Sequence, residues 1–289
     1  MQKDFQCLIN TFKNSIKTWD YFVNWEKVFS KSSELEIILN KLNYLLGKEN
    51  LKEEFKRLYE GNPDIVKAFP VLLAVREKQL EIFNLSDGSS EFFDFSNNQK
   101  ENDSFEKYYL FLEKTGLINL FNREGIKNLV DYVIGVEVGL DSNGRKNRGG
   151  TLMEKIVESH ISKLCAQKGF EYIAQARSTD IRAKWGVEVN VDKSERSFDF
   201  AVCNPSNKMI KLFEVNFYNG GGSKLKAVCG EFKSLYDELK NQSIDFIWIT
   251  DGLGWNTTRR PLEETYNHNE YVFNLNMVEQ GILEELNWQ

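Results

Sequence analysis

Two acidic residues on neighbouring predicted strands are the residues of this sequence best suited to chemistry. Asp199 lies in the segment 197–202, while Glu214 and Asn216 lie in the segment 212–218. Side chains alternate between the two faces of a strand, and the turn-forming residues 204–207 favour a hairpin. The sequence therefore predicts these three polar side chains side by side on one face of a sheet. The opposite, apolar face would be formed by Phe198, Phe200, Val202, Phe213, Val215 and Phe217.

A carboxylate pair of this kind is costly unless a cation balances its charge. Two carboxylates about 4 Å apart repel by ~4 kcal/mol at an effective dielectric constant of about 20. Mg²⁺ prefers oxygen ligands and often takes only one or two carboxylates, together with water and substrate phosphate. Bound there, it lowers the pKa of a coordinated water and stabilises charge on phosphorus oxygens. We therefore expect Asp199 and Glu214 to bind Mg²⁺ for phosphodiester hydrolysis. The alternative is that both are solvent-facing residues of ordinary strands.

A glycine-rich turn, NGGGSK at 219–224, follows the second of these strands and precedes a predicted helix. Glycines let backbone N–H groups approach a phosphate, and the N-terminus of a helix favours an anion. We expect Ser223 and Lys224 to contact DNA, with Lys224 near enough to the carboxylates to act on the scissile phosphate. The alternative is a flexible connector with Ser223 as the helix N-cap.

A cluster of basic residues lies in the segment 139–150, whose composition predicts a loop. Its members Arg145, Lys146, Asn147 and Arg148 include the types that read guanine and adenine in the major groove. As a solvated surface loop the segment would be unremarkable. The helix predicted over 151–168 carries Glu154, which could be a further metal ligand. Thr151 and Glu154 also fit a capping box, which we favour.

The order of predicted elements defines two regions of an α/β (α+β) protein. Residues 1–130 follow a helical pattern, and we expect this N-terminal region to serve DNA binding, dimerisation or both. Residues 131–289 follow the order helix, strands, helix, strand, which predicts a mixed β-sheet flanked by helices and a catalytic domain.

Composition narrows the functional class. The net charge of −6 means that DNA affinity must come from local basic clusters and not from overall charge. Four scattered cysteines and two histidines argue against a zinc site or a disulfide framework. The sequence shows no signal peptide and no apolar run of the ~18 residues that a membrane span needs. We expect a cytoplasmic protein with no membrane partner.

Several blocks, in one order, resemble the MboI/DpnII type II restriction endonucleases. The likeness begins at WDYF (19–22) and LNYLLG (42–47) and continues almost to the C-terminus. The later blocks are NLVDYV (128–133), GVEVGLD (135–141), GRKNR (144–148), FDF (198–200), EVNFY (214–218), GSKL (222–225) and WITDGLGW (248–255). Together these blocks are highly specific, whereas any single one would be weak.

The resemblance implies a PD-(D/E)xK nuclease core that cleaves unmethylated 5′-GATC-3′ before the guanine and leaves 5′ overhangs. It also implies an adenine methyltransferase that protects the host DNA. Asp199 and Glu214 match the acidic positions of the superfamily motif. Phe198 replaces the proline of this motif. Asn216 replaces its lysine, so the motif positions themselves supply no positive charge. Asn216 can hydrogen-bond a water but carries no charge, and Lys224 is our candidate for the charge.

Because GATC is palindromic, we expect a homodimer with one active site for each strand of double-stranded DNA. Two other functions remain open. One is a repair or junction nuclease of the same fold, and the other is a non-catalytic protein that senses GATC methylation. The absent lysine keeps the second of these open.

Overall fold

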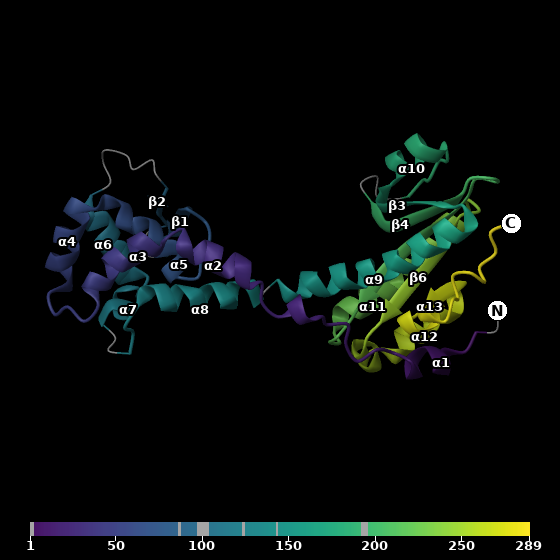
Figure 1. Cartoon of the computed structure of the whole chain (residues 1–289), viewed down its shortest axis with the longest axis horizontal. Coiled ribbons are helices and arrows are strands. Elements are labelled where there is room, and N and C mark those ends of the chain that lie inside the picture. The colour runs from purple at the N-terminus through teal and green to yellow at the C-terminus, as the bar shows by residue number, and fades with distance from the viewer. Residues whose placement is uncertain (1–2, 86–87, 97–103, 123–124, 143, 192–195) are drawn as a thin grey trace. The chain divides into compact units, whose positions relative to one another are not determined.

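The structure is a computed structural model that describes residues 3–85, 88–96, 104–122, 125–142, 144–191 and 196–289. It divides into two compact units, which are described separately (Figure 1). Unit 1 comprises Met1–Thr18 and Lys146–Gln289, and unit 2 comprises Trp19–Arg145. Among the described residues, no helix is both long enough and apolar enough to cross a membrane.

Unit 1 is built on a five-stranded mixed sheet with the strand order β3-β4-β5-β6-β7. The pairs β3/β4 and β4/β5 are antiparallel, and the pairs β5/β6 and β6/β7 are parallel. The mixed sheet flanked by helices confirms the predicted fold class. Its strands are β3 (Glu171–Arg177), β4 (Ser197–Asn204), β5 (Met209–Phe217), β6 (Asp245–Asp251) and β7 (Tyr271–Phe273). Its helices are α1 (Phe5–Asn10), α9 (Arg145–Lys168), α10 (Ser178–Trp185), α11 (Ser223–Lys240), η4 (Leu253–Thr257), α12 (Arg259–His268) and α13 (Leu275–Glu279).

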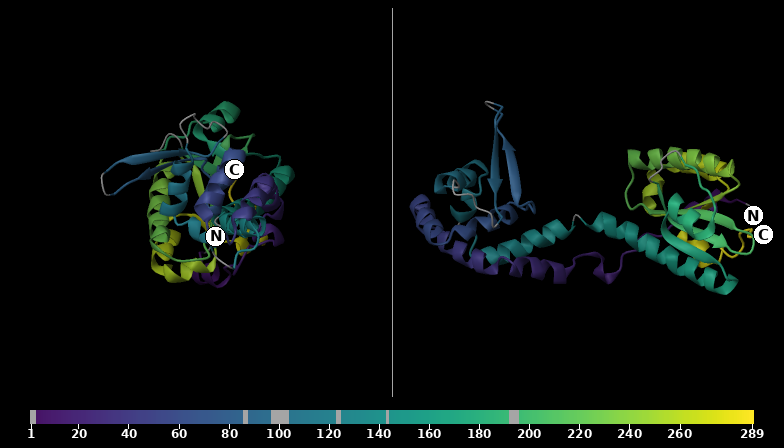
Figure 2. Two further views of the ribbon diagram at one scale, coloured as in Figure 1. Left: turned by 90° about the vertical axis from the view of Figure 1, so that its left-hand side faces the viewer. Right: turned by 90° about the horizontal axis from the view of Figure 1, so that it is seen from above.

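Helices cover both faces of this sheet, and each face has its own apolar core. On one face, α11 packs through a stripe that includes Leu225, Phe232 and Leu239, joined by residues of α1, α10 and α12. On the other face, α9 packs through Met153 and Ile161, joined by α13 and the C-terminal residues. The second view in Figure 2 shows α11 and α9 on opposite sides of the sheet.

The first 18 residues belong to the sheet unit and not to the helical unit. Leu8 and Ile9 of α1 are buried in the core beneath α11. The buried Asp251 at the end of β6 accepts backbone hydrogen bonds from Lys13, at 2.6 Å, and from Leu275, at 2.9 Å. The division therefore differs from the predicted ranges 1–130 and 131–289. Helical periodicity at the N-terminus indicated a helix but could not indicate which core that helix joins.

Unit 2 is mainly helical around an aromatic core in which Phe55, Phe69 and Phe111 are almost fully buried. It also contains an antiparallel hairpin, β1 (Gln79–Phe83) and β2 (Ser90–Asp94). The helical pattern predicted over residues 1–130 does not include these strands, so the hairpin is a correction. Phe93 and Phe95 alternate into the core, and this burial sets a strand there. The helices are η1 (Trp19–Tyr21), α2 (Trp25–Ser33), α3 (Glu36–Leu42), η2 (Asn43–Leu45), α4 (Leu51–Gly61), η3 (Pro63–Ala68), α5 (Phe69–Leu72), α6 (Phe105–Lys114), α7 (Ile118–Asn122) and α8 (Leu129–Ser142).

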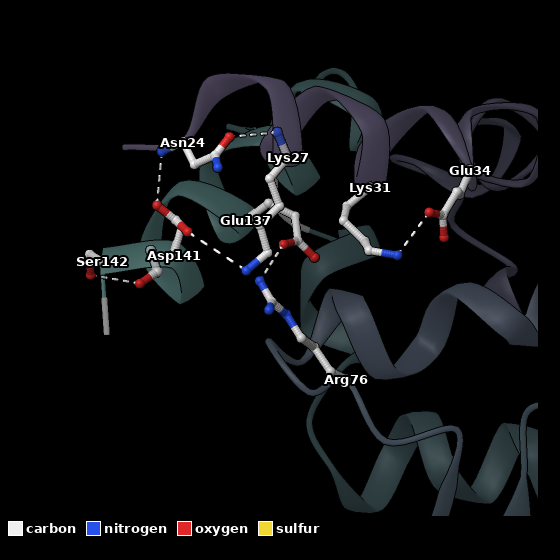
Figure 3. Close-up of polar contacts among 9 residues, drawn as sticks. Asn24, Lys27, Lys31, Glu34, Arg76, Glu137, Asp141 and Ser142 are labelled. Carbon is white, nitrogen blue, oxygen red and sulfur yellow. Dashed lines mark hydrogen bonds and ion pairs between the residues drawn. The ribbon is translucent and has the colours of Figure 1, made fainter. Parts of the chain in front are cut away.

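Two buried acids of α8 are held by cations within unit 2 (Figure 3). Arg76 Nη2 lies 2.7 Å from Glu137 Oε2, and Lys27 Nζ lies 3.9 Å from Asp141 Oδ1. The backbone N–H of Asn24 also donates to Asp141 Oδ2, at 3.0 Å. Buried carboxylates need such partners because desolvation of an unpaired charge is costly. Asp141 therefore ties α8 to the start of α2, and Glu137 ties α8 to the segment between α5 and β1.

Candidate active site

The β4 and β5 strands separate at the point where the acidic residues begin. Their ladder runs from Asn204↔Met209 to Phe200↔Phe213, which confirms the predicted hairpin. At the next position, Asp199 Oδ2 accepts a hydrogen bond from the backbone N–H of Val215, at 2.7 Å. The carboxylate thus takes the place of a strand carbonyl as the acceptor for Val215. This bond fixes the carboxylate of Asp199 beside the backbone of Val215, the residue after Glu214.

The alternation of side chains is broken on the N-terminal side of Asp199. Phe200 and Val202 lie in the core beneath α9, but Phe198 lies in the core beneath α11. The prediction that Phe198 shares a face with Phe200 is therefore wrong. The β3/β4 pairing skips the Gln175–Asp199 position, and Gln175 has a left-handed φ of 52°. An irregularity of this kind re-aims side chains locally, and a two-residue period cannot predict it.

Glu154 approaches Asp199 through a shared glutamine. Gln175 Nε2 donates to Glu154 Oε2 at 3.1 Å and to Asp199 Oδ1 at 3.4 Å. The predicted capping box is wrong because α9 begins at Arg145, which places Thr151 inside the helix. Glu154 is thus free of capping and points toward β3 and β4. The sequence offered no signal for Gln175, because β3 itself was not predicted.

Burial raises the pKa of all three carboxyl groups, and repulsion from Asp199 adds to the shift for Glu214 and Glu154. Burial is the largest cause for Glu214, followed by the charge of Asp199, and together they raise its pKa to about 8. Burial first, and then the charge of Asp199, raises the pKa of Glu154. Burial raises the pKa of Asp199, although its bond from Val215 opposes the shift. A divalent cation would offset the desolvation and repulsion of carboxylates that are brought together in this way. Across the described ranges, however, no three Asp, Glu, His or Cys side chains meet at the spacing of one ion.

Arg196 is a site residue that the sequence analysis missed. It immediately precedes β4, and its Nε lies 3.8 Å from Glu214 Oε1. Its Nη2 donates to Glu231 Oε1 on α11, at 3.1 Å. The charge of Arg196 lowers the pKa of Glu214 against the larger effect of burial. The position of Arg196, three residues before Asp199, is visible in the sequence. Only the fold shows that this arginine turns toward Glu214.

Asn216 lies on the same face as Glu214, but its amide is tied to the core. Its Oδ1 accepts a hydrogen bond from Trp248 Nε1 on β6, at 2.8 Å. Trp248 is fully buried in the core beneath α11. This bond leaves only the amide N–H groups of Asn216 for a water or a phosphate. The catalytic role of Asn216 stays a prediction.

The glycine-rich turn is braced by the turn that follows β6. A Cβ added to Gly221 would lie 1.9 Å from Thr257 Oγ1, and one added to Gly254 would lie 2.5 Å from the carbonyl oxygen of Gly220. Trp255 is fully buried and donates to Thr250 Oγ1 at 2.8 Å. Residues 250–255 therefore form a structural turn built around a core tryptophan.

Helix α11 begins at Ser223, with Gly222 as its N-cap and no side-chain cap bond. The interpretation of Ser223 as the N-cap is therefore wrong. Ser223 and Lys224 are both exposed in the first turn, which leads directly from the end of β5. Their contacts with DNA stay predictions.

The predicted basic loop is helical. Helix α8 continues through Gly139 to Ser142, and Arg145 to Arg148 form the first turn of α9. The prediction of a loop over 139–150 is therefore wrong, since glycines are tolerated inside both helices. Arg145 Nε donates to the carbonyl oxygen of Phe22 at 3.0 Å. The side chains of Lys146 and Asn147 lie outside the described part of the structure.

A mixed sheet flanked by helices, with carboxylates gathered where two strands separate, defines an α/β protein with a nuclease-like core. Comparison with known proteins gives the same class. The DpnII restriction endonuclease family matches residues 4–285. The type II restriction enzyme MjaIII of Methanocaldococcus jannaschii is 47% identical over 287 residues, covering 98% of this chain and 99% of the relative.

Two further relatives are matched over at least 90% of both chains. The type II restriction enzyme LlaDCHI of Lactococcus lactis subsp. cremoris is 42% identical over 93% of this chain and 90% of its own length. The type II restriction enzyme DpnII of Streptococcus pneumoniae is 36% identical over 98% of both chains. The chain therefore belongs to the DpnII restriction endonuclease family, which confirms the resemblance seen in the sequence. It is a site-specific deoxyribonuclease that acts on DNA as part of a restriction-modification system.

Proposed function

We propose that this enzyme cleaves double-stranded DNA at unmethylated 5′-GATC-3′, before the guanine, and leaves four-base 5′ overhangs. The family membership supports DNA cleavage, and the blocks shared with MboI and DpnII support the target. The observation that carries the chemistry is the burial of Glu214 beside the fixed carboxylate of Asp199, which raises the pKa of Glu214. Buried like charges of this kind mark a functional site more often than a structural one.

Type II restriction enzymes generally need a divalent metal ion. In this protein Asp199 and Glu214 would hold it, and we propose Mg²⁺ because both ligands are hard oxygen donors. The ion would supply an attacking water of lowered pKa and would neutralise charge on the phosphate. The bond from Val215 orients Asp199, while Gln175 keeps Glu154 beside Asp199 as a possible third acid.

The first turn of α11 is suited to the scissile phosphate. It lacks a side-chain cap and carries Ser223 and Lys224 in exposed positions. Backbone N–H groups at a helix N-terminus attract anions, and Lys224 adds a full charge. The first turn of α9, with Arg145, Lys146, Asn147 and Arg148, would read the bases. A homodimer would place one such site on each strand of the palindrome, and an adenine methyltransferase would protect host DNA.

Plasmid from adenine-methylating and non-methylating hosts tests this proposal. With Mg²⁺, the protein should cut only the unmethylated plasmid, and sequencing of the ends should place the break before guanine. Asp199→Asn should cut neither plasmid, whereas Glu263→Gln, which changes an exposed residue of α12, should cut normally. Equal cutting of both plasmids would instead indicate a repair or junction nuclease. Methylation-dependent binding without cutting would indicate a sensor.

A further inference from the structure

The guanidinium of Arg196 is a buried cation in the carboxylate site. Only 10% of its side chain is exposed, against 13% for Glu214 and 42% for Glu231. Its Nη2 is held by Glu231 of α11 at 3.1 Å. Its Cζ lies 5.9 Å from the centre of the Phe198 ring, which belongs to the core beneath α11. The position of this charge is therefore set by two elements, β4 and α11.

One atom of this guanidinium has no hydrogen-bond acceptor among the residues that the structure describes. Arg196 Nε is buried and donates no hydrogen bond to any of them, although Glu214 Oε1 lies 3.8 Å away. A buried donor without an acceptor is destabilising, so an arrangement that keeps it needs a compensating use. A small movement of the Glu214 carboxylate would complete the bond. The guanidinium of Arg196 therefore faces Glu214 and is anchored by its hydrogen bond to Glu231.

We propose that Arg196 is a positioning residue that supplies the fixed positive charge which Asn216 cannot supply at the usual lysine position. It acts through Glu214 by holding this carboxylate and offsetting its negative charge where the DNA phosphate must approach. Glu231 fixes the guanidinium in turn. This inference rests on the proposed function of Asp199 and Glu214, and it replaces Lys224 as the source of charge. Lys224 remains a phosphate contact at the exposed N-terminus of α11.

A role of Arg196 through its charge and a role through packing alone predict different results. Without Arg196, Glu214 presents an uncompensated negative charge to the phosphate, so DNA should bind more weakly even when no metal is present. That loss should disappear when Glu214 itself is neutral, because the arginine then has nothing to offset. A merely structural role of Arg196 would give the same loss in both backgrounds.

The test is a double-mutant cycle on binding to a GATC duplex in EDTA. We expect Arg196→Ala to weaken binding by ~10-fold, the scale of one close charge pair. In the Glu214→Gln background, the same substitution should change binding by less than ~3-fold, as expected for sites that no longer interact. Arg182→Ala, which removes an exposed arginine paired with Glu188, is the matched control and should leave binding unchanged.

Single-turnover cleavage with Mg²⁺ supplies the second readout. Arg196→Ala should slow cleavage by ~10²–10³-fold, as the loss of one electrostatic contact at a reacting phosphate does. Arg196→Lys should recover most of this rate because it restores the charge. Glu231→Gln should give an intermediate rate, since the arginine keeps its charge but loses its anchor.

Two results would overturn the proposal. One is an equal loss of binding from Arg196→Ala in both backgrounds, and the other is a cleavage rate within threefold of wild type. Failure of the proposed function looks different, because wild-type protein would then leave unmethylated GATC intact. The metal-free binding cycle needs no cleavage, so it decides the role of Arg196 in either case.

Discussion

Replacing Glu214 by glutamine should stabilise the metal-free protein and abolish its activity. The side chain is 13% exposed and lies beside Asp199, which repels it, and beside Arg196, which attracts it. Burial is the largest of these influences, and the net effect is a pKa of about 8 in place of 4.5. Glutamine has nearly the same shape but no charge to desolvate, so it removes the penalty and keeps the packing.

The size of the effect follows from the two pKa values. The folded protein binds the Glu214 proton more tightly than the unfolded chain does, so the free energy of unfolding falls as pH rises from 4.5 to about 8. Each pH unit in this window costs about 1.4 kcal/mol. The penalty on the wild type is therefore about 3 kcal/mol at pH 7 and approaches about 5 kcal/mol above pH 8. Solvent relaxation makes these values upper estimates.

Urea unfolding in EDTA between pH 5 and pH 9 measures this prediction. The difference in unfolding free energy between Glu214→Gln and wild type should grow with pH and then level off above pH 8. Mg²⁺ should stabilise wild type at pH 8 but leave the variant nearly unchanged, because metal binding favours the native state only where the ligands are intact. Glu263→Gln is the control on an exposed helix position and should follow wild type at every pH.

A variant that is less stable than wild type at pH 8, or a difference that stays constant from pH 5 to pH 9, would refute this reasoning. Either outcome would mean that Glu214 is ionised and well solvated in the folded protein. The gathered carboxylates would then exert no strain, and their use as a metal site would lose its main physical support.

Three further predictions follow from other parts of the site. Asp199→Ala removes the acceptor for the backbone N–H of Val215 and should cost about 1–3 kcal/mol in urea unfolding, whereas Asp199→Asn can keep that bond and should be inactive but nearly as stable as wild type. Gly254→Ala would place a methyl group 2.5 Å from the carbonyl oxygen of Gly220. This substitution should lower the free energy of unfolding by about 2 kcal/mol or more, and the melting temperature by several degrees. Gly139→Ala, where a methyl group meets nothing within 4 Å, is its control and should be neutral or slightly stabilising. Lys224→Ala should weaken binding to GATC and unrelated duplexes alike, and should reduce the slope of log K against log salt by about 1; an unchanged slope would remove Lys224 from the phosphate contacts.

The apolar pattern of the sequence was sufficient for the strands that carry Asp199 and Glu214. Phe213, Val215 and Phe217 do share one face, with Glu214 on the other, because a regular strand imposes a period of two. The turn at 204–207 likewise joins β4 to β5 as predicted. The mixed sheet and its flanking helices followed from the order of these elements. Local rules were enough because each of these features depends on neighbours in the sequence.

Residues that meet across the fold could not be obtained in this way. The left-handed conformation of Gln175 and the break in alternation at Asp199 arise where three strands adjust to one another. Glu154 joins the site only because Gln175 of β3 bridges it to Asp199. The first 18 residues join unit 1 because Asp251 and the core beneath α11 bind them.

The sequence by itself determined the class of protein and predicted its two central acids, because both rest on residue types at short spacing. Only the tertiary structure decided the charges around those acids. It tied Asn216 to Trp248 and brought Arg196, held by Glu231, to Glu214. Electrostatic energies depend on distance and burial in space, and neither can be read from the separation of residues along a chain.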